Sequence, residues 1–370
     1  MGLLNLINNI AHIPVFEDVC YYNFFFWAWF LGPLLGGLVF LHDLTTGFFF
    51  SIFYVKPSLD KVIFITGCDT GFGKTLALRL QNKGFKVYAT CLNQQNADAL
   101  KKECEALHTV ILDVTKEDQV ARVVAEVDAA NPQGLFALVN NAGVSRAGLI
   151  DWLNISDYRF CMEVNYFAMV SVTKAFLPSL KKSKGRVIMM SSIMGVTCGL
   201  PVTSAYSASK RAVEIFSSAL RQELRPWGIT VSTINPGFHR TEINRNASDN
   251  LKLTFEKAPQ EVQEQYGEKY LHAASAAMTR YTETKALDPK NVIRAYIHAT
   301  TSTRPKVQYR VGIDAKGLFP FLQIFPLRVG EVIAYYASTT PEMRVIRGAK
   351  WGQGSAPVGV SPAVAATQNV

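Results

Sequence analysis

Residues 62–80 have the sequence VIFITGCDTGFGKTLALRL, and this stretch decides the fold. Its first four residues are a short apolar run, which is typical of a buried parallel strand. Gly67, Gly71 and Gly73 follow, and the residues from Lys74 onward have the composition of a helix. Glycines in such a turn let the backbone approach phosphates, and the dipole of the following helix favours an anion. The stretch therefore predicts a pyrophosphate-binding turn, and the alternative is an ordinary strand-to-helix turn.

Apolar runs of strand length alternate with amphipathic stretches of helix length from residue 61 to residue 311. The strands are predicted near residues 62–66, 86–91, 108–112, 135–140, 186–191, 229–235 and 307–311. Helices are predicted between them, including Glu117–Ala130, Tyr158–Lys181 and Ser204–Leu224. This alternation is typical of a doubly wound parallel sheet. We therefore predict an α/β fold, Rossmann-like and built as a single domain.

Tyr206 and Lys210 lie four residues apart in a predicted helix, in the run YSASK. Residues with this spacing stack on one helix face, so a phenol and an ammonium group would lie side by side. A nearby cation favours the phenolate and lowers the pKa of the tyrosine. A tyrosine tuned in this way can act as a general acid or base. The alternative is that both residues are merely solvated or packed.

Further motifs follow in a fixed order along the chain. They are NNAG at residues 140–143, Asn165 within a predicted helix, Ser191-Ser192 after a predicted strand, and PGFHRT at residues 236–241. Together with the glycine turn and the Tyr206–Lys210 pair, they resemble the short-chain dehydrogenase/reductase family over roughly residues 60–245. The resemblance implies a Rossmann-like fold, a nicotinamide cofactor and an alcohol dehydrogenase activity.

The resemblance also implies a catalytic tetrad. Tyr206 would be the acid/base, and Lys210 would lower its pKa and bind the nicotinamide ribose. Ser192 would hydrogen-bond the substrate oxygen and is therefore also the expected substrate residue. Asn165 would position a helix backbone and a water for proton relay, or would be purely structural. The spacing from Ser192 to Tyr206 is one residue longer than the family's usual spacing, which indicates an insertion within residues 195–199.

The cofactor contacts implied by the resemblance are distributed over the same motifs. The glycines of the turn would line the pyrophosphate, Asp113 would lie against the adenine, Asn140 and Gly143 under the ribose, and Thr241 at the carboxamide or a phosphate. The full set of expected cofactor-binding residues is Gly67, Asp69, Thr70, Gly71, Phe72, Gly73, Asp113, Val114, Asn140, Ala142, Gly143, Tyr206, Lys210, Pro236, Gly237 and Thr241.

Asp69 points to NAD rather than NADP. A 2′-phosphate needs a nearby arginine or lysine, whereas a free 2′-hydroxyl suits a carboxylate. The second predicted strand, residues 86–93, ends without a basic residue, and Asp69 stands before the second glycine of the turn. An acidic side chain at this place would repel a phosphate, so NAD is the expected cofactor and NADP the alternative.

The residues around the turn narrow the resemblance to one branch of the family. TGCDTGFG, YATCL at residues 88–92 and YRVGIDAK at residues 309–316 resemble microsomal retinol dehydrogenases, 17-beta-hydroxysteroid dehydrogenases and 3-hydroxybutyrate dehydrogenase. The branch implies oxidation or reduction of a lipophilic alcohol. The alternatives are a 3-hydroxybutyrate-type enzyme, with Arg245 and Lys252 as candidates to hold a carboxylate, and a non-catalytic membrane scaffold.

The N-terminal region is expected to be a membrane anchor. Val19–Leu41 contains no charged residue, and as a helix it would span about 34 Å, enough for a bilayer core of about 30 Å. A second uncharged stretch, Leu44–Val55, is too short to span. We expect residues 1–58 to be the anchor, 59–315 the catalytic domain with a substrate lid at 242–285, 316–350 an apolar segment near the membrane or at the substrate entrance, and 351–370 a disordered tail.

The charge pattern suits a membrane protein with a cytosolic catalytic domain. Lys56 and Lys61 follow the apolar region and no lysine or arginine precedes it, so the positive-inside rule places the catalytic domain on the cytosolic face of the membrane. The resemblance to microsomal enzymes implies the endoplasmic reticulum, with a mitochondrial membrane as the alternative. A signal peptide is the competing interpretation of the N-terminus. The net charge of +9 accompanies no nucleic-acid-binding motif, the six cysteines show no metal-binding spacing, and a homo-oligomer is compatible with the family.

Overall fold

The computed structural model describes residues 53–197, 199–241, 246–280, 286–324 and 327–344. The chain divides into two units, Ser58–Tyr296 with Val307–Val370, and Met1–Pro57 with Ile297–Lys306. The larger unit contains the sheet and the candidate site.

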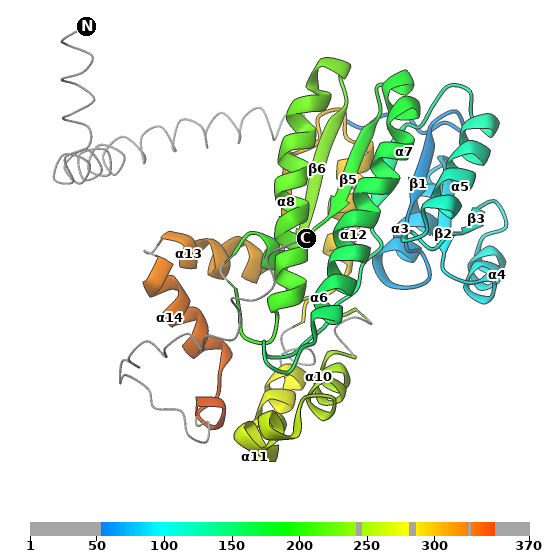
Figure 1. The fold of residues 1–370 in the computed structure, drawn as a ribbon. Helices are drawn as coiled ribbons and strands as arrows, with labels where there is room; N and C mark the ends of the chain where they lie inside the picture. Colours follow the sequence, from blue (N-terminus) through cyan, green and yellow to red (C-terminus); the bar gives the residue numbers. More distant parts are fainter. Residues whose placement is uncertain (1–52, 198, 242–245, 281–285, 325–326, 345–370) are drawn as a thin grey trace, which may run out of the picture. The chain divides into compact units, whose positions relative to one another are not determined.

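One parallel sheet of seven strands, in the order β3-β2-β1-β4-β5-β6-β7, forms the centre of the larger unit (Figure 1). Its strands are β1 Val62–Ile65, β2 Lys86–Cys91, β3 His108–Ile111, β4 Ala137–Asn140, β5 Arg186–Met190, β6 Thr230–Pro236 and β7 Gln308–Val311. The order reverses between β1 and β4, and ligands of open α/β sheets bind outside the carboxyl ends of the strands at such a point. The predicted doubly wound fold is confirmed.

The helices that flank the sheet follow the strands in the alternation that the sequence predicts. They are α3 Gly71–Asn82, α4 Gln94–Glu103, α5 Glu117–Ala130, α6 Ile155–Met162, α7 Ala168–Ser183, α8 Ser204–Leu224 and α12 Lys290–Thr301. Short turns are η2 Ile193–Gly195 and η3 Arg225–Trp227. The α5 helix packs against α7.

Burial explains why these segments form these elements. All four residues of β1 are buried, as are all four of β4, because helices cover both faces of the parallel sheet. In α5 the buried residues are Val120, Val123, Val124 and Val127, a spacing of three and four that forms one apolar helix face. The remaining faces of α5 carry its charged residues.

A π-helical turn, η1 Glu163–Phe167, joins α6 directly to α7. A π turn accommodates one extra residue in a helix and is frequent at functional sites. Asn165 lies in this turn and is fully buried. Both α6 and η1 pack against α8, so the irregular turn faces the helix that carries Tyr206 and Lys210.

Two pairs of helices lie outside the sheet and its flanking helices. The first pair is α10 Ala247–Glu256 and α11 Gln260–Arg280, which fall within the expected lid. Trp152 is buried beside this pair, among Phe255 and Tyr270. The second pair, α13 Phe319–Ile324 and α14 Leu327–Ser338, follows the π turn η5 Asp314–Leu318, and the short turn η6 Glu342–Arg344 comes after it.

The smaller unit is held together by backbone pairing. Val55 N–H donates to the carbonyl of Thr301 at 2.7 Å, and Thr303 N–H donates to the carbonyl of Phe53 at 2.9 Å. Tyr54 forms an antiparallel bridge with Ser302. The segment before the first strand is thus paired with the segment that follows α12.

None of the helices in the described part of the chain is long and apolar enough to cross a membrane. The predicted span at Val19–Leu41, most of Leu44–Val55, the ends of the lid at 242–245 and 281–285, and the tail at 351–370 lie outside the described residues.

Candidate active site

Tyr206 and Lys210 lie one turn apart near the start of α8. Lys210 is 2% exposed, its Nζ donates to the carbonyl of Met190 at 2.9 Å, and this nitrogen is 5.8 Å from the centroid of the Tyr206 ring. Burial lowers the pKa of Lys210 to about 8, and Cys161 and Glu214 oppose that shift. The ammonium group is therefore held in the interior, beside the phenol, with its proton weakly bound.

Ser192 approaches Tyr206 from the end of β5. The pKa of the Tyr206 phenol is raised, whereas the sequence predicts a lowered one, because burial outweighs the hydrogen bond with Ser192 that lowers it, and Cys161 raises it further. The Ser192 hydroxyl also accepts the N–H of Met194 at 3.2 Å, at the start of η2. Ser192 and Tyr206 are thus in contact, and a substrate oxygen placed between them would meet both hydroxyl groups.

Asn165 fixes the backbone beside Lys210. Its Oδ1 accepts the N–H of Val144 at 2.8 Å, and its Nδ2 donates to the carbonyl of Val144 and to the hydroxyl of Ser209, each at 2.9 Å. A Cβ atom added to Gly143 would lie 3.1 Å from Asn165 Oδ1 and 3.4 Å from Lys210 Nζ. The structure therefore brings Tyr206, Lys210, Ser192, Asn165 and Gly143 together.

The glycine turn between β1 and α3 is closely packed on its inner side. A Cβ atom added to Gly73 would lie 2.2 Å from the carbonyl oxygen of Gly67 and 2.5 Å from Asn141 Nδ2. Gly67 adopts a φ of +69°, a left-handed conformation in which a residue with a side chain would be strained. Asn141 Nδ2 donates to the carbonyls of Thr66 and Gly67 at 3.0 and 2.9 Å. Only glycine fits at Gly73 without moving the turn.

The outer side of the same turn is open. Gly71 has a φ of +63°, and no heavy atom lies within 4 Å of the place where its Cβ would stand. Thr70, the N-cap of α3, makes no side-chain hydrogen bond to the helix, and the first turn of α3 contains no acidic residue. The first N–H groups of α3 are therefore presented to an anion, as a cofactor pyrophosphate requires.

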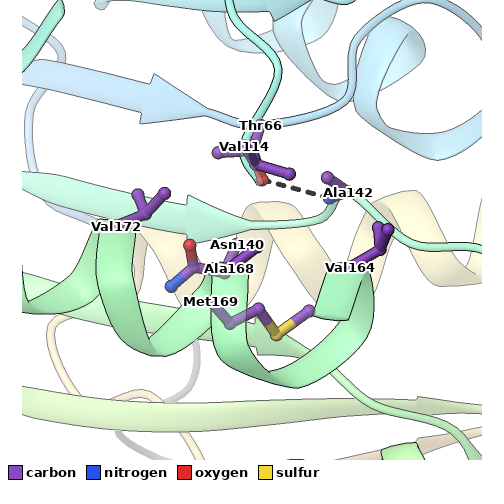
Figure 2. Close-up of a pocket in the computed structure, with 8 residues that line it drawn as sticks. All are labelled: Thr66, Val114, Asn140, Ala142, Val164, Ala168, Met169 and Val172. Atoms are coloured by element: carbon purple, nitrogen blue, oxygen red, sulfur yellow. Dashed lines mark hydrogen bonds between the residues drawn. The ribbon is translucent and has the colours of Figure 1, made fainter. Parts of the chain in front are cut away.

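A narrow pocket lies beside the turn, at the carboxyl ends of β1 and β4 (Figure 2). Its lining residues are Thr66, Val114, Asn140, Ala142, Val164, Ala168, Met169 and Val172. Three of them, Val114, Asn140 and Ala142, belong to the expected cofactor set. The Thr66 hydroxyl accepts the N–H groups of Asn141 and Ala142 at 2.9 and 3.0 Å, which ties the NNAG segment to the glycine turn.

Asp69 lies between the glycine turn and the end of β2. Its Oδ1 accepts the N–H of Leu92 and the side-chain amide of Asn96, each at 2.8 Å. Lys74, in the first turn of α3, forms an ion pair with Glu103 on α4. Asp113, after β3, accepts the N–H and the hydroxyl of Thr115 at 3.0 and 2.7 Å. Asp69 is therefore a half-buried carboxylate at the edge where an adenosine ribose would lie.

β6 ends at Pro236, Gly237 begins the turn that follows, and the described part of this turn ends at Thr241. Asp314, 76 residues beyond Phe238, accepts the N–H of Phe238 at 2.7 Å. A Cβ atom added to Gly237 would lie 2.1 Å from an oxygen of Asp314. The turn is thus clamped to the segment before α13. His239, in the same turn, is 1% exposed and lies edge-on to Phe72 of the glycine turn.

An apolar wall adjoins Tyr206. It is made by Ile193, Met194 and Val196 of the loop after β5 together with Ala315, Phe319, Leu322 and Ala334, and the partly buried Tyr206, Phe238 and Leu200 pack against it. In the same loop Val202 has a φ of +62°, unusual for a β-branched residue, and its carbonyl accepts the N–H of Gly148 at 3.0 Å. The loop that the sequence predicts to carry an insertion thus contains a strained backbone.

Several residues of the site were missed from the sequence. Thr66, Asn141 and Asp314 hold the cofactor-side turns through hydrogen bonds, and Tyr296 donates to Asn141 Oδ1 at 3.0 Å. Asn141 belongs to the NNAG motif, but it is not among the site residues predicted from the sequence. Each acts through a contact between distant parts of the chain, and the spacing of motifs carries no signal for such contacts.

Comparisons with known proteins agree with this geometry. Residues 61–252 match the short chain dehydrogenase family. The chain is 36% identical to Retinol dehydrogenase 16 of Mus musculus, covering 73% of this chain and 86% of the relative. It is also 36% identical to 17-beta-hydroxysteroid dehydrogenase type 6 of Bos taurus, covering 71% and 84%.

A short chain dehydrogenase of Burkholderia cenocepacia, solved in complex with NADP, shares the fold. Its TM-score is 0.58 at 24% identity, and the match covers 74% of this chain and 97% of that protein. The resemblance seen in the sequence is confirmed by the family match and the relatives. This chain belongs to the short-chain dehydrogenase/reductase family and is an oxidoreductase that uses a nicotinamide cofactor.

Proposed function

We propose that this protein is a membrane-associated, NAD-dependent dehydrogenase that interconverts a lipophilic alcohol, a retinol or a hydroxysteroid, and its carbonyl. The observation that carries the proposal is the group formed by the partly buried Tyr206 and the buried Lys210, Ser192 and Asn165 beside an open glycine turn. A phenol, a hydroxyl and an ammonium group in one apolar enclosure suit proton transfer to or from an alcohol oxygen.

Each side chain has a distinct part in this chemistry. Bound NAD would accept or return a hydride at the carbinol carbon. Tyr206 takes the hydroxyl proton in oxidation, and Ser192 donates a hydrogen bond to the same oxygen. Lys210 stabilises the phenolate, because an opposite charge favours the ionised form. Asn165 holds the backbone of Val144 and the hydroxyl of Ser209, which keeps α8 in place.

The cofactor preference rests on Asp69. Its carboxylate is held at the end of β2 by Leu92 and Asn96, and the nearby Lys74 is paired with Glu103. A carboxylate suits a free 2′-hydroxyl and repels a 2′-phosphate. The pyrophosphate would be held by the residues of the glycine turn, which are Gly67, Thr70, Gly71, Phe72 and Gly73. Asp113 would lie against the adenine of NAD, and Thr241 would bind the carboxamide or a phosphate.

The substrate class rests on the apolar wall and on the relatives. Apolar side chains border Tyr206 on the loop after β5 and on α13, and the relatives named above are retinol and hydroxysteroid dehydrogenases. A lipophilic alcohol partitions into bilayers, so an anchored enzyme shortens its path. We propose residues 1–58 as the anchor, residues 59–315 as a cytosolic catalytic domain, the endoplasmic reticulum as the site, and a homo-oligomer as the assembly.

The test is the initial rate with NAD and with NADP, using detergent-solubilised protein and all-trans-retinol, 11-cis-retinol, androstanediol, estradiol and 3-hydroxybutyrate. Turnover of a retinol or steroid with NAD is expected. Turnover of 3-hydroxybutyrate alone would show that the substrate is a hydroxy acid and not a retinol or hydroxysteroid. A faster rate with NADP would refute the assignment to Asp69, and a Tyr206→Phe variant with unchanged turnover would refute catalysis at this site.

A further inference from the structure

A chain of hydrogen-bonded polar side chains is connected to the backbone of Ser192. Asn235, fully buried at the end of β6, donates from Nδ2 to the carbonyl oxygen of Ser192 at 3.2 Å and to Glu214 Oε1 at 2.5 Å. Its Oδ1 accepts the hydroxyl of Thr233 at 3.0 Å. The second carboxylate oxygen of Glu214 accepts the side-chain amide of Gln308 at 3.4 Å.

Glu214 lies one turn beyond Lys210 on α8. It raises the pKa of Lys210, against the stronger lowering by burial. One carboxylate is therefore connected to two catalytic residues, to Ser192 through the amide of Asn235 and to Lys210 through its charge.

From this arrangement we propose that Glu214 is a positioning residue, which orients the Asn235 amide so that this amide holds the backbone of Ser192. The inference deepens the proposed function and rests on it.

The role proposed for Glu214 requires a carboxylate, because a carboxylate and an amide differ in the hydrogen bonds that they can make. An ionised carboxylate only accepts hydrogen bonds, whereas an amide offers donors on one side and an acceptor on the other. Glu214 therefore forces the NH₂ group of Asn235 toward itself, and the second hydrogen of that group reaches the Ser192 carbonyl. A glutamine at position 214 could donate to Asn235 Oδ1 instead. The reversed amide would then turn an oxygen toward the Ser192 carbonyl, and the hydrogen bond would be lost.

The consequence for Ser192 is direct, because its hydroxyl is hydrogen-bonded to Tyr206. A displaced Ser192 weakens the hydrogen bond that lowers the pKa of Tyr206, so that pKa rises. Loss of the charge of Glu214 lets the pKa of Lys210 fall below its value of about 8. Besides Glu214, the Cys161 thiol of α6 acts on both groups. Of the other elements packed against α8, η2 and β6 contain no ionisable side chain, and η1 brings the neutral Asn165 together with the exposed Glu163 and the partly buried Tyr166. The remaining ionisable side chains of these elements are Asp157, Tyr158 and Arg159 of α6 and Arg225 of η3. On α8 itself, Glu214 also interacts with Arg221, whose Nε donates to the carbonyl of Val231 at 3.0 Å.

The direction of both shifts gives a signature that a general loss of packing does not produce. Oxidation needs the Tyr206 phenolate and the Lys210 ammonium, but the pKa of Tyr206 is raised while that of Lys210 is lowered to about 8, so only a small fraction of the enzyme holds both forms at once. The rate should therefore rise up to the pKa of Lys210, stay level between the two pKa values and fall above the pKa of Tyr206. Glu214→Gln lowers the first pKa and raises the second, so the level part of the profile should become lower and extend further on both sides.

The experiment compares the full-length wild type with Glu214→Gln, Glu214→Asp and the control Glu223→Gln, an exposed residue on the same helix. For Glu214→Gln we expect kcat to fall about tenfold, the effect of about one hydrogen bond, with KM for the cofactor unchanged and the level part of the pH profile widened. Glu214→Asp keeps the charge and should restore the acid limb, which the pKa of Lys210 sets. Glu223→Gln should match the wild type.

A second measurement needs no turnover. Amide hydrogen exchange at Met194, whose N–H is bonded to the Ser192 hydroxyl, should be faster in unliganded Glu214→Gln than in the wild type. Unchanged kcat, or a slower enzyme with unmoved limbs and unchanged exchange at Met194, would overturn the proposal. If Glu214→Gln does not fold, Glu214→Asp decides, because a lower kcat with an intact acid limb is expected of it and wild-type kcat would refute the role. A wild type that turns over no alcohol would instead refute the proposed function, while the exchange comparison would still test the hydrogen-bonded chain.

Discussion

Gly73 offers the sharpest test of the cofactor site, because the substitution Gly73→Ala places one atom where none fits. The added Cβ would stand 2.2 Å from the carbonyl oxygen of Gly67 and 2.5 Å from Asn141 Nδ2, whereas real Cβ atoms essentially never approach within 3.0 Å. The turn must therefore open by about 1 Å. A displacement of about 1 Å at a positioning group costs about 100-fold in the affected step, and overpacking costs about 1–3 kcal/mol of stability.

The measurement is the dissociation constant for NAD, from quenching of tryptophan fluorescence, together with the unfolding temperature. We expect Gly73→Ala to bind NAD at least about tenfold more weakly, a lower bound on the loss from the displaced turn. Gly317→Ala is the matched control, since nothing lies within 4 Å of its Cβ and its φ is not positive. If Gly73→Ala bound NAD and unfolded like the wild type, the packing on the inner side of the turn would not determine the shape of the pyrophosphate site, and the reasoning would be refuted.

Four further predictions follow from named contacts. Asp69→Asn keeps the shape of the side chain and removes its charge, so the ratio of kcat/KM for NADP to that for NAD should rise about tenfold, the Coulomb effect of one partly solvated charge; an unchanged ratio contradicts the assignment of NAD. Tyr206→Phe should lose at least about 100-fold in kcat while the dissociation constant for NAD stays the same, and activity close to wild type would exclude the acid/base role. Trp152→Ala should lower the free energy of unfolding by about 3–5 kcal/mol in denaturant titration, because the indole is 1% exposed; a loss below about 1 kcal/mol would mean that the site collapses without cost. Lys210→Met should abolish turnover without lowering the unfolding temperature at pH 7, and a large drop in that temperature would show that the ammonium stabilises the fold.

The fold could be predicted from the sequence because it depends on local patterns. The helices predicted at Glu117–Ala130 and Ser204–Leu224 have these bounds in the structure, and all seven strands fall within or one residue beyond the predicted ranges. Both patterns can be recognised within one short stretch of sequence, since a helix shows apolar residues at a spacing of three and four and a buried strand shows a short apolar run. The π turn at Glu163–Phe167 was missed, because one extra residue in a helix leaves the apolar pattern almost unchanged.

The site could be predicted only where family motifs mark it. Tyr206, Lys210, Ser192 and Asn165 were expected together, and they lie together. Asp314, by contrast, contacts a turn 76 residues earlier in the chain. No periodicity in one sequence connects such positions, so the residues that support the site could be found only from the structure.

Lys210 shows why the supporting residues matter as much as the tetrad itself. The pKa of its ammonium falls from 10.5 to about 8 on burial, so the folded state binds this proton more weakly than the unfolded state does. Stability should therefore rise as the pH increases from about 8 to about 10.5, and below that range the buried charge is a cost. A fold that carries such a cost needs contacts that oppose it, here the Met190 carbonyl and the charge of Glu214. The pH range in which Lys210 remains protonated is thus set by residues outside the catalytic tetrad, and substitutions there should change the pH dependence of the enzyme without touching the substrate.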